Sequence, residues 1–563
     1  MAYPQPQEGI IQARKQLAKM LTKAANSAQQ AGIIPPVTLP EVTVERPQNS
    51  EHGDYASSFP LKLARSARIN PMVIANELVK ILQAESDIAD IAVAPPGFIN
   101  FTLKTGWVSS QVDSILAAAD KFGDTDIGKG SSIQLEFVSA NPTGPLHVGN
   151  GRGAILGSAL SAVFAAAGYK VEQEYYVNDG GAQIHTFYRS LYARYMQTLN
   201  VDSPMPADGY QGVYVTELAK EIIAEQGDKF LKKPEAEAVK ELGRIGLEKM
   251  LALIRYDLGL LRVNFDVWFS ENSLYQSGLY DQVMGILRRN GFLTEREGAT
   301  WFVSTALGDD KDNVVVRGDG SPTYFASDIA YHYDKFVLRK FDRVINIWGA
   351  DHQGHVSRMK AVVNALGIDP KRLDVILYQL VTLCRGEEVV RLSKRSGDII
   401  TLREVVEEVG ADACRFFFLA RSADSQMDFD LELAKKQSQD NPVYYVQYAH
   451  ARISSILRLA KERGIDYTDG DVSLLNTEPE LTLIRKMLRL SEIVETIVQT
   501  SEPHHLTYYA QDLATVFHSF YKQCRVVTEE EATTKARLKL VEATKIVLAK
   551  TLHLMGITAP EKM

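Results

Sequence analysis

The part of the chain most capable of chemistry is residues 136–150, which read EFVSANPTGPLHVGN. A short apolar segment just before it predicts a strand, so these residues follow the strand's carboxyl end, where doubly wound sheets bind nucleotides. Gly149, Gly151 and Gly153 open the expected next helix without side-chain bulk, so a phosphate could approach the backbone N–H groups there. His147 can donate a hydrogen bond to a phosphate oxygen while charge builds in a transition state. Taken alone, a glycine-rich turn capped by a histidine accounts for the same letters.

A second candidate lies about 240 residues later, at 391–397, which read RLSKRSG. Lys394 offers a mobile positive charge and Ser393 a hydroxyl, and both groups suit a triphosphate. By itself this segment is better explained as a solvated basic turn. The pairing of the two loops on one α/β scaffold favours a nucleotide site.

The surrounding segments predict the parallel sheet that would position both loops. Residues 133–138 read as a strand, 149–167 as a helix of small residues and 169–177 as a second strand. Strand, helix, strand is a βαβ unit, the start of a parallel sheet with helices on its faces. Residues 185–300 are more helical and predict an insertion. Alternation then returns, with strands expected at 312–317, 343–348 and 375–380.

The two ends of the chain differ from this middle part. The N-terminal part predicts helices at 10–31 and 71–82 and a strand at 98–103, and the C-terminal part carries amphipathic helical patterns at 481–500 and 507–527. We therefore expect a multidomain α/β protein. Its parts would be a small α+β domain at 1–122, a doubly wound (Rossmann-like) catalytic domain at 130–420 with an insertion at about 185–300, and an all-helical domain at 421–563.

Composition narrows the class of protein further. No apolar run approaches the length of a membrane span, and the first residues lack a basic-then-apolar leader, so we expect a cytoplasmic protein. The three cysteines, Cys384, Cys414 and Cys524, lie far apart, which argues against a disulfide scaffold and against a thiolate zinc site. The formal net charge of -8 counts mildly against a nucleic-acid partner, although a local basic stripe can lie on an acidic whole.

Several strings in the chain resemble one known family. The His147 and Lys394 loops resemble the HIGH and KMSKS motifs of class I aminoacyl-tRNA synthetases. Longer strings resemble arginyl-tRNA synthetases in particular, and they continue in order to the closing MGITAPEKM: SANPTGPLHVGNGRGAILG, SPTYFASDIAYH, NIWGADHQGHVSRMKA, GADACRFFFL and NPVYYVQYAHARISSI. The resemblance covers essentially the whole chain. Two positions depart from the family pattern, since Asn150 replaces the second histidine of HIGH and RLSKR replaces KMSKS.

The resemblance implies an ATP-dependent ligase that activates arginine to arginyl-adenylate and transfers it to the 3' end of tRNA(Arg). AMP and pyrophosphate would be the other products, magnesium would arrive with ATP, and adenylate formation would require bound tRNA. The catalytic residues would be His147, Asn150 and Lys394, where Asn150 can still donate a hydrogen bond but cannot carry an imidazolium charge. The same three would bind ATP together with Gly149, Gly349, Asp351, His352 and Ser393.

The arginine pocket can also be argued from charge. A guanidinium group is planar, permanently charged and rich in donors, so it needs fixed carboxylates and planar acceptors. By resemblance, Glu136, Tyr324 and Asp328 would hold it, and the last two share a face if their segment is helical. Ser139, Asn141 and Gln353 would lie near the α-amino and carboxylate groups. Surface solvation or a helix cap is the alternative for each residue, and Asp328 could be an ordinary helix residue.

Metal and tRNA contacts are less sharply indicated. His352 and His355 have a metal-like spacing without an evident third ligand, so we expect no protein-held metal and magnesium held mostly by phosphates. Tyr448 and Arg452 in the C-terminal helices would contact the anticodon loop, although aromatics at helical spacing usually form core. By resemblance, the N-terminal domain would bind the D-loop, with Phe98 and Asn100 on its last strand. The family leads us to expect a monomer.

Three alternatives stay open at this point. A synthetase for cysteine would need zinc-binding thiols, and one for leucine, isoleucine or valine would need a longer editing insertion. A small-molecule nucleotidyl transferase would rarely carry a helical domain of about 150 residues after its catalytic part. An RNA-binding relative without chemistry finds support only in Asn150.

Overall fold

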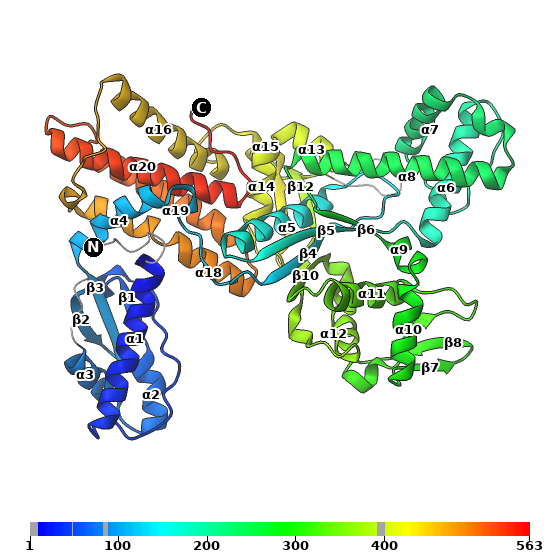
Figure 1. Cartoon of the computed structure of the whole chain (residues 1–563). Coiled ribbons are helices and arrows are strands. Elements are labelled where there is room, and N and C mark those ends of the chain that lie inside the picture. Colours follow the sequence, from blue (N-terminus) through cyan, green and yellow to red (C-terminus); the bar gives the residue numbers. More distant parts are fainter. Residues whose placement is uncertain (1–8, 48, 83–87, 391–399) are drawn as a thin grey trace.

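The computed structural model describes residues 9–47, 49–82, 88–390 and 400–563. A five-stranded sheet, in which every neighbouring pair is parallel, forms the centre of the molecule (Figure 1). Its strand order is β11-β10-β4-β5-β6, with bounds β4 Ser132–Phe137, β5 Lys170–Val177, β6 Val267–Ser270, β10 Arg343–Gly349 and β11 Leu373–Tyr378. The chain adds β5 and β6 on one side of β4 and later returns to add β10 and β11 on the other. The order reverses between β4 and β10, and a doubly wound sheet binds its ligand beyond the carboxyl ends of the strands at such a reversal.

Helices cover both faces of this sheet, which confirms the expected doubly wound class. On one face, α5 (Val148–Ala166) packs across β4, β5 and β10. Gly157 of α5 allows this contact, since a Cβ atom there would overlap the ring of Phe137. On the other face, α11 (Tyr324–Tyr333) and α12 (Val356–Ala365) contribute to a second buried apolar cluster that includes Val344 and Leu373.

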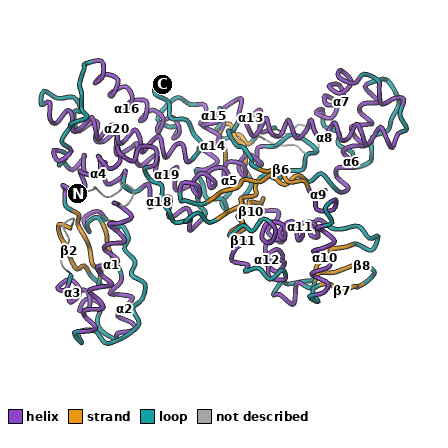
Figure 2. The backbone as a smooth tube through the Cα atoms, viewed as in Figure 1, coloured by secondary structure: helices purple, strands orange, loops and turns teal. Residues whose placement is uncertain are grey.

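Two excursions leave the sheet at its β6 edge (Figures 1 and 2). The first is an arm of three helices, α6 (Gly181–Thr198), α7 (Val213–Gln226) and α8 (Glu235–Leu260). The second holds α9 (Glu271–Gln276), α10 (Leu279–Arg289) and an antiparallel sheet of β7 (Leu293–Arg296), β8 (Ala299–Phe302) and β9 (Asn313–Val316).

These excursions correct two expectations. The single insertion expected at about 185–300 is interrupted by β6, which pairs with β5 and belongs to the central sheet. The strand expected at 312–317 exists as β9 but lies in the separate antiparallel sheet, because it pairs with β8. Strands of four residues carry too little pattern to reveal which sheet they join.

The N-terminal part is a small α+β unit, as expected. Helices α1 (Gly9–Gln30), α2 (Phe59–Ala67) and α3 (Pro71–Ile81) accompany an antiparallel sheet of order β1-β3-β2, formed by Tyr55–Ser57, Phe98–Leu103 and Ile88–Ala94. The next helix, α4 (Thr105–Ala118), packs against α17 and α20 of the C-terminal part. The expected domain 1–122 therefore contains a helix that packs with the other end of the chain.

The C-terminal part is a bundle of long helices. It comprises α16 (Pro442–Glu462), α17 (Glu478–Met487), α18 (Leu490–Thr500), α19 (His504–Gln523) and α20 (Glu531–Leu554), preceded by α13 (Leu402–Val409), α14 (Ala411–Leu419) and α15 (Leu431–Lys435). One correction applies, because β14 (Met427–Asp430) interrupts the helices and pairs with β12 (Val381–Arg385), which also pairs with β13 (Glu388–Val389). No helix in the described ranges is both long and apolar enough to span a membrane.

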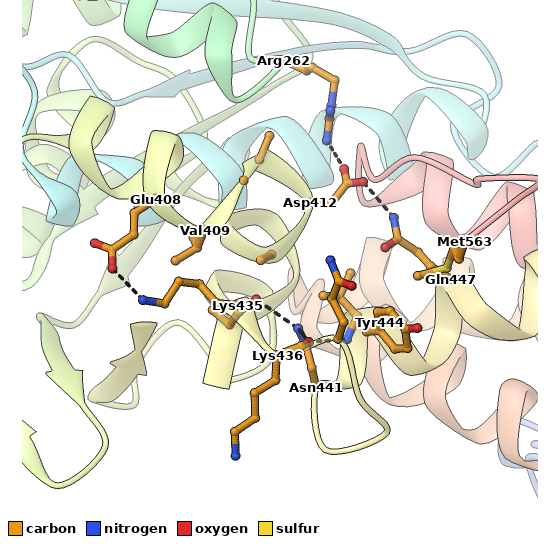
Figure 3. A pocket seen from close by; sticks show the side chains of 16 residues that line it. Arg262, Glu408, Val409, Asp412, Lys435, Lys436, Asn441, Tyr444, Gln447 and Met563 are labelled. Carbon is orange, nitrogen blue, oxygen red and sulfur yellow. Dashed lines mark hydrogen bonds and ion pairs between the residues drawn. The ribbon is translucent and has the colours of Figure 1, made fainter. Parts of the chain in front are cut away.

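Asp412 at the start of α14 joins the sheet domain to the bundle. Its carboxylate accepts hydrogen bonds from Arg262 after α8, Gln447 of α16 and Thr558 of the C-terminal tail. Figure 3 shows the contacts of Asp412 with Arg262 and Gln447 beside a cavity of about 540 Å³ that none of the expected nucleotide or arginine residues lines. The cavity therefore lies at a structural joint and not at the candidate site.

Candidate active site

The His147 loop is organised by a reciprocal cap on helix α5. His147 Nδ1 accepts a hydrogen bond from the N–H of Gly149 at 3.1 Å, and Asn150 Oδ1 accepts one from the N–H of His147 at 3.1 Å. With Nδ1 as acceptor, a neutral imidazole carries its proton on Nε2, so Nε2 is the donor. The loop thus presents a histidine donor at the amino end of a helix, where an anion is favoured.

The segment that follows the second motif lies against the first motif. The backbone of His147 forms an antiparallel bridge with Thr401, and the N–H of Leu402 donates to Leu146 O at 2.8 Å. Ser393 and Lys394 themselves lie in 391–399, outside the described residues. The segment that directly follows them is therefore fixed to the His147 loop, although the two motifs are far apart in sequence.

The glycines after His147 serve two different purposes. A Cβ atom at Gly151 would lie 2.6 Å from Leu402 Cδ1, and one at Gly153 would lie 2.9 Å from Tyr378 Cε1. Both positions are filled by protein, so the expectation that a phosphate approaches there is wrong. At Gly149 a Cβ atom would meet only the His147 ring, at 3.0 Å. Gly149 alone keeps the proposed role of an open approach.

The carboxyl end of β10 supplies the next candidates. Gly349 ends this strand, and Asp351, His352 and Gln353 follow on an exposed 3₁₀ turn. A Cβ atom at Gly349 would lie 2.5 Å from Asp351 Oδ1, so glycine leaves room for this carboxylate. Burial and then the Asp351 charge raise the pKa of Tyr378 to about 12. Tyr378, at the end of β11, also lies against Gly153 of α5. The carboxyl ends of β10 and β11 therefore both lie beside this helix.

Acidic side chains from β4, α9 and α11 form a cluster of Glu136, Glu271 and Asp328. Burial, then the charges of Glu136 and Glu271, raises the pKa of Asp328 on α11 to about 8. Glu271, the first residue of α9, is 5% exposed, and burial raises the pKa of its carboxyl as well. Among the described residues no basic side chain forms an ion pair with Asp328 or Glu271. This acidic cluster therefore favours a cationic group that can keep the carboxylates of Asp328 and Glu271 charged.

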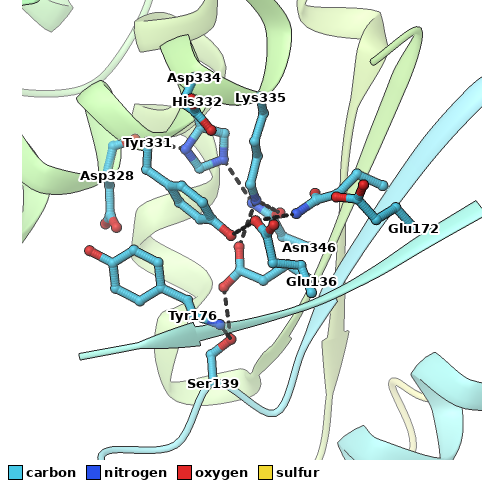
Figure 4. A network of polar contacts seen from close by, with 12 residues as sticks. Glu136, Ser139, Glu172, Tyr176, Asp328, Tyr331, His332, Asp334, Lys335 and Asn346 are labelled. Atoms are coloured by element: carbon cyan, nitrogen blue, oxygen red, sulfur yellow. Dashed lines mark hydrogen bonds and ion pairs between the residues drawn. The ribbon is translucent and has the colours of Figure 1, made fainter. Parts of the chain in front are cut away.

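Glu136 has a partner that the sequence did not predict (Figure 4). Its Oε2 accepts from the buried Lys335 Nζ at 2.7 Å, and its Oε1 accepts from Ser139 Oγ at 3.0 Å. Lys335 also donates to Asn346 Oδ1 at 3.0 Å. The Glu136 charge is thus balanced by Lys335, and the carboxylate orients Ser139 at the end of β4.

Two remaining arginine candidates, Asn141 and Tyr324, each lie against the start of α6. Asn141 Nδ2 donates to Gln183 Oε1 of α6 at 2.7 Å. Tyr324 is 45% exposed, and its hydroxyl lies 3.7 Å from where a Cβ atom of Gly181 would be, at the start of α6. Tyr324 and Asp328 do lie on one helix, as expected.

Two residues that sequence reasoning missed belong to this site. Glu271 directly follows β6, at a carboxyl strand end, and recognition of β6 as a strand would have revealed it. Arg152, fully buried one turn into α5, donates at 2.8 Å to Gln379 O, Ser422 O and Ser425 O. Arg152 thereby fixes the His147 helix to the segments that follow β11 and α14.

The predicted tRNA residues have different surroundings. On α16, Arg452 donates to Tyr448 Oη at 2.8 Å, and its guanidinium lies 4.8 Å from the Tyr448 ring centre and 5.4 Å from that of Tyr521. These side chains line a cavity of about 500 Å³ together with Gln439, Tyr445, His518 and Lys522. On β3, Phe98 is half-buried, but Asn100 is only 8% exposed within the sheet. Asn100 is therefore poorly placed for a tRNA contact.

Comparison with known proteins agrees with this architecture. Three family models match, the arginyl tRNA synthetase N-terminal domain at 12–103, the class I (R) tRNA synthetase catalytic domain at 111–429 and the DALR anticodon binding domain at 446–563. A protein named arginine–tRNA ligase from Dehalococcoides mccartyi is 59% identical over 554 residues, covering 98% of this chain and 100% of the relative. Another of that name from Moorella thermoacetica is 49% identical over 558 residues, covering 98% and 100%.

A solved structure has the same fold. The arginyl-tRNA synthetase of Thermus thermophilus superposes with a TM-score of 0.76 at 22% identity, covering 98% of this chain and 100% of that one. Fold and site together thus define a class I aminoacyl-tRNA synthetase. The relatives narrow this class, and the chain belongs to the arginyl-tRNA synthetase (arginine–tRNA ligase) family. The resemblance drawn from the motifs is confirmed.

Proposed function

We propose that this chain ligates arginine to tRNA(Arg). Arginine's carboxylate attacks the α-phosphorus of ATP and pyrophosphate leaves, and the terminal ribose hydroxyl of the tRNA then takes the arginyl group and releases AMP. The observation that carries this proposal is the bridge between His147 and Thr401, which joins the flank of one nucleotide motif to the other. Positioning and electrostatic stabilisation suffice for this chemistry without a covalent protein intermediate.

For ATP, the proposed donors are His147 Nε2 and the Asn150 amide at the start of α5. Both would meet phosphate oxygens as charge develops, and the positive end of the helix adds to them. Ser393 and Lys394 would complete the triphosphate site, while Gly349, Asp351 and His352 would meet the adenosine. Magnesium would be bound mostly by the phosphates and by no dedicated set of protein ligands.

For arginine, we assign the guanidinium to Asp328, with Glu271 and Tyr324 beside it. The raised pKa of Asp328 supports this assignment, because a guanidinium restores the charge that burial disfavours. Glu136 acts indirectly on the arginine, because its hydrogen bond with Ser139 positions the Ser139 hydroxyl. Ser139, Asn141 and Gln353 would bind the α-amino and carboxylate groups.

For tRNA, the cavity around Tyr448 and Arg452 suits an unpaired base. Aromatic faces stack on bases, and an Arg guanidinium held above a ring offers donors to a base edge. Burial, then the Arg452 charge, lowers the pKa of His518 to about 4, so His518 is neutral at physiological pH and leaves the positive charge to Arg452. We propose further that Phe98 contacts the D-loop, and that the chain acts as a monomer in the cytoplasm.

An ATP–pyrophosphate exchange assay tests the proposal. Exchange is expected with arginine in the presence of tRNA, and not with lysine or citrulline, which lack a guanidinium. Exchange with arginine but without tRNA would remove only the expected tRNA requirement. Exchange that requires another amino acid would overturn the assignment of the acidic cluster.

A further inference from the structure

Three potential metal ligands gather at the start of α19, far in sequence from the candidate active site. Glu502, His504 and His505 each place one ligand atom within 4.8 Å of the others. Glu502 Oε2 and His505 Nε2 are 3.3 Å apart, and the two imidazole centres are 4.4 Å apart. Two imidazoles and one carboxylate form a donor set suited to a borderline divalent metal.

One of these residues, His504, has an unsatisfied hydrogen-bonding atom. His504 Nδ1 is buried and has no hydrogen-bond partner among the described residues. A buried ring nitrogen without a partner is unfavourable, and native structures rarely leave one.

We propose that Glu502, His504 and His505 form a binding site for Zn²⁺ or a related divalent transition metal. Ligand atoms about 2.0–2.1 Å from a tetrahedral zinc ion lie about 3.4 Å from one another. The Glu502–His505 pair already has this separation, so only His504 must approach. A water molecule or a further carboxylate takes the fourth position.

The place of this site in the fold gives it a consequence. The Asp424 carboxylate acts electrostatically on His504 from the loop after α14. The same loop presents Ser422 O and Ser425 O to Arg152 of the His147 helix. A cation on the histidines would therefore attract Asp424 and strengthen the contact between the C-terminal bundle and the active-site helix.

A simpler arrangement competes with this one. Glu502 and His505 can form an ion pair at the start of α19 with no metal, and the positive end of that helix disfavours a cation. The ion pair leaves His504 Nδ1 without a partner among the described residues, whereas a metal bound through that nitrogen would satisfy it. The carboxylate of Glu502 offsets the helix end in the metal-bound form.

The test uses the full-length chain without an affinity tag, freed of metal by a chelator. Co²⁺ is titrated and followed by its visible absorption, which is strong for tetrahedral sites, and Zn²⁺ is titrated calorimetrically. The double variant His504→Asn/His505→Asn is expected to bind one equivalent fewer than the parent chain, and Glu502→Gln to bind at least tenfold more weakly. A matched control removes two exposed histidines elsewhere, His52→Asn/His553→Asn.

The outcomes separate clearly. Loss of one equivalent in the first variant, with the control unchanged and circular dichroism showing both folded, supports the site. Absence of metal binding by the parent chain, or equal binding by the parent and the His504→Asn/His505→Asn variant, overturns it. If the double variant fails to fold, Glu502→Gln decides, because unchanged affinity there contradicts the proposal.

Discussion

The side chains of His147 and Asn150 together cap the start of α5. Asn150 Oδ1 accepts a hydrogen bond from the N–H of His147, and His147 Nδ1 accepts one from the N–H of Gly149. Asn150 stands where the HIGH motif has its second histidine. A capping side chain explains how asparagine keeps the loop in place, because its oxygen accepts while its amide group stays a donor. This departure from the motif is therefore compatible with nucleotide binding.

Replacement of Asn150 separates capping from chemistry. Asn150→Ala removes the cap and the amide donor, so we expect unfolding free energy to fall by about 0.5–2 kcal/mol and the exchange rate to fall by about tenfold or more. Asn150→His restores a donor and should keep the rate within a few-fold of the parent. Chemical denaturation and ATP–pyrophosphate exchange measure the two effects. An Asn150→Ala variant with parental kcat would exclude a catalytic role.

Breaking the ion pair between Lys335 and Glu136 is expected to lower the free energy of unfolding. Both side chains are buried, so Lys335→Met leaves an unpaired carboxylate and should destabilise the fold by about 3–5 kcal/mol. Adding Glu136→Gln removes the stranded charge, so the double variant should recover part of that loss. Urea denaturation of the parent, both single variants and the double variant gives the coupling. Additive losses would show that the two groups do not interact.

Arginine binding should depend on pH through Asp328. Its folded pKa of about 8 lies well above the ordinary range of an aspartate, so the free chain holds a proton there below pH 8 that a guanidinium must displace. Arginine affinity should therefore fall about tenfold per pH unit below pH 8 and level off above it. Calorimetric titration measures this, and Asp328→Asn should weaken binding about a hundredfold at pH 8.5 and remove the pH dependence.

The carboxyl group of Asp328 also determines how the stability of the fold changes with pH. Because the folded pKa is raised, the contribution of Asp328 favours folding at low pH and is lost as pH rises from about 4 to 8. Saturating arginine should offset this loss, so its stabilising effect on Tm should be larger at pH 8.5 than at pH 6.5. An equal shift at both values would contradict the assignment of the guanidinium to Asp328.

Replacement of Arg452 should weaken tRNA binding and leave the turnover rate at saturating tRNA nearly unchanged. Arg452→Lys keeps the charge but loses the planar group above Tyr448 and Tyr521, so KM for tRNA should rise about tenfold with kcat nearly unchanged. Arg458→Lys, an exposed arginine on the same helix, is the control. Steady-state charging kinetics distinguish them, and equal KM values would remove Arg452 from the interface.

What the sequence predicted well was carried by strong local patterns. The βαβ unit around His147 was predicted, because apolar strands and a glycine-rich loop are local signals. The doubly wound class followed from them. The shared face of Tyr324 and Asp328 was expected only on condition that their segment is helical, and α11 meets that condition. The role of Glu271 was not predicted, because the strand before it, β6, has only four residues.

Long-range pairs were beyond any local pattern. Lys335 meets Glu136 across 199 residues, and no spacing in the sequence indicates that contact. The packing of α4 against α17 and α20 likewise depends on which apolar faces meet in space. Gly151 and Gly153 looked open to phosphate for the same reason, since Leu402 and Tyr378 approach from distant segments.

The most direct test of the central claim is charging of tRNA with each standard amino acid in turn, with ATP and magnesium present. We expect arginine alone to be attached, and Asp328→Asn to lower kcat/KM for arginine about a hundredfold. Attachment of a different amino acid at comparable kcat/KM, or tRNA binding with no attachment at all, would contradict it.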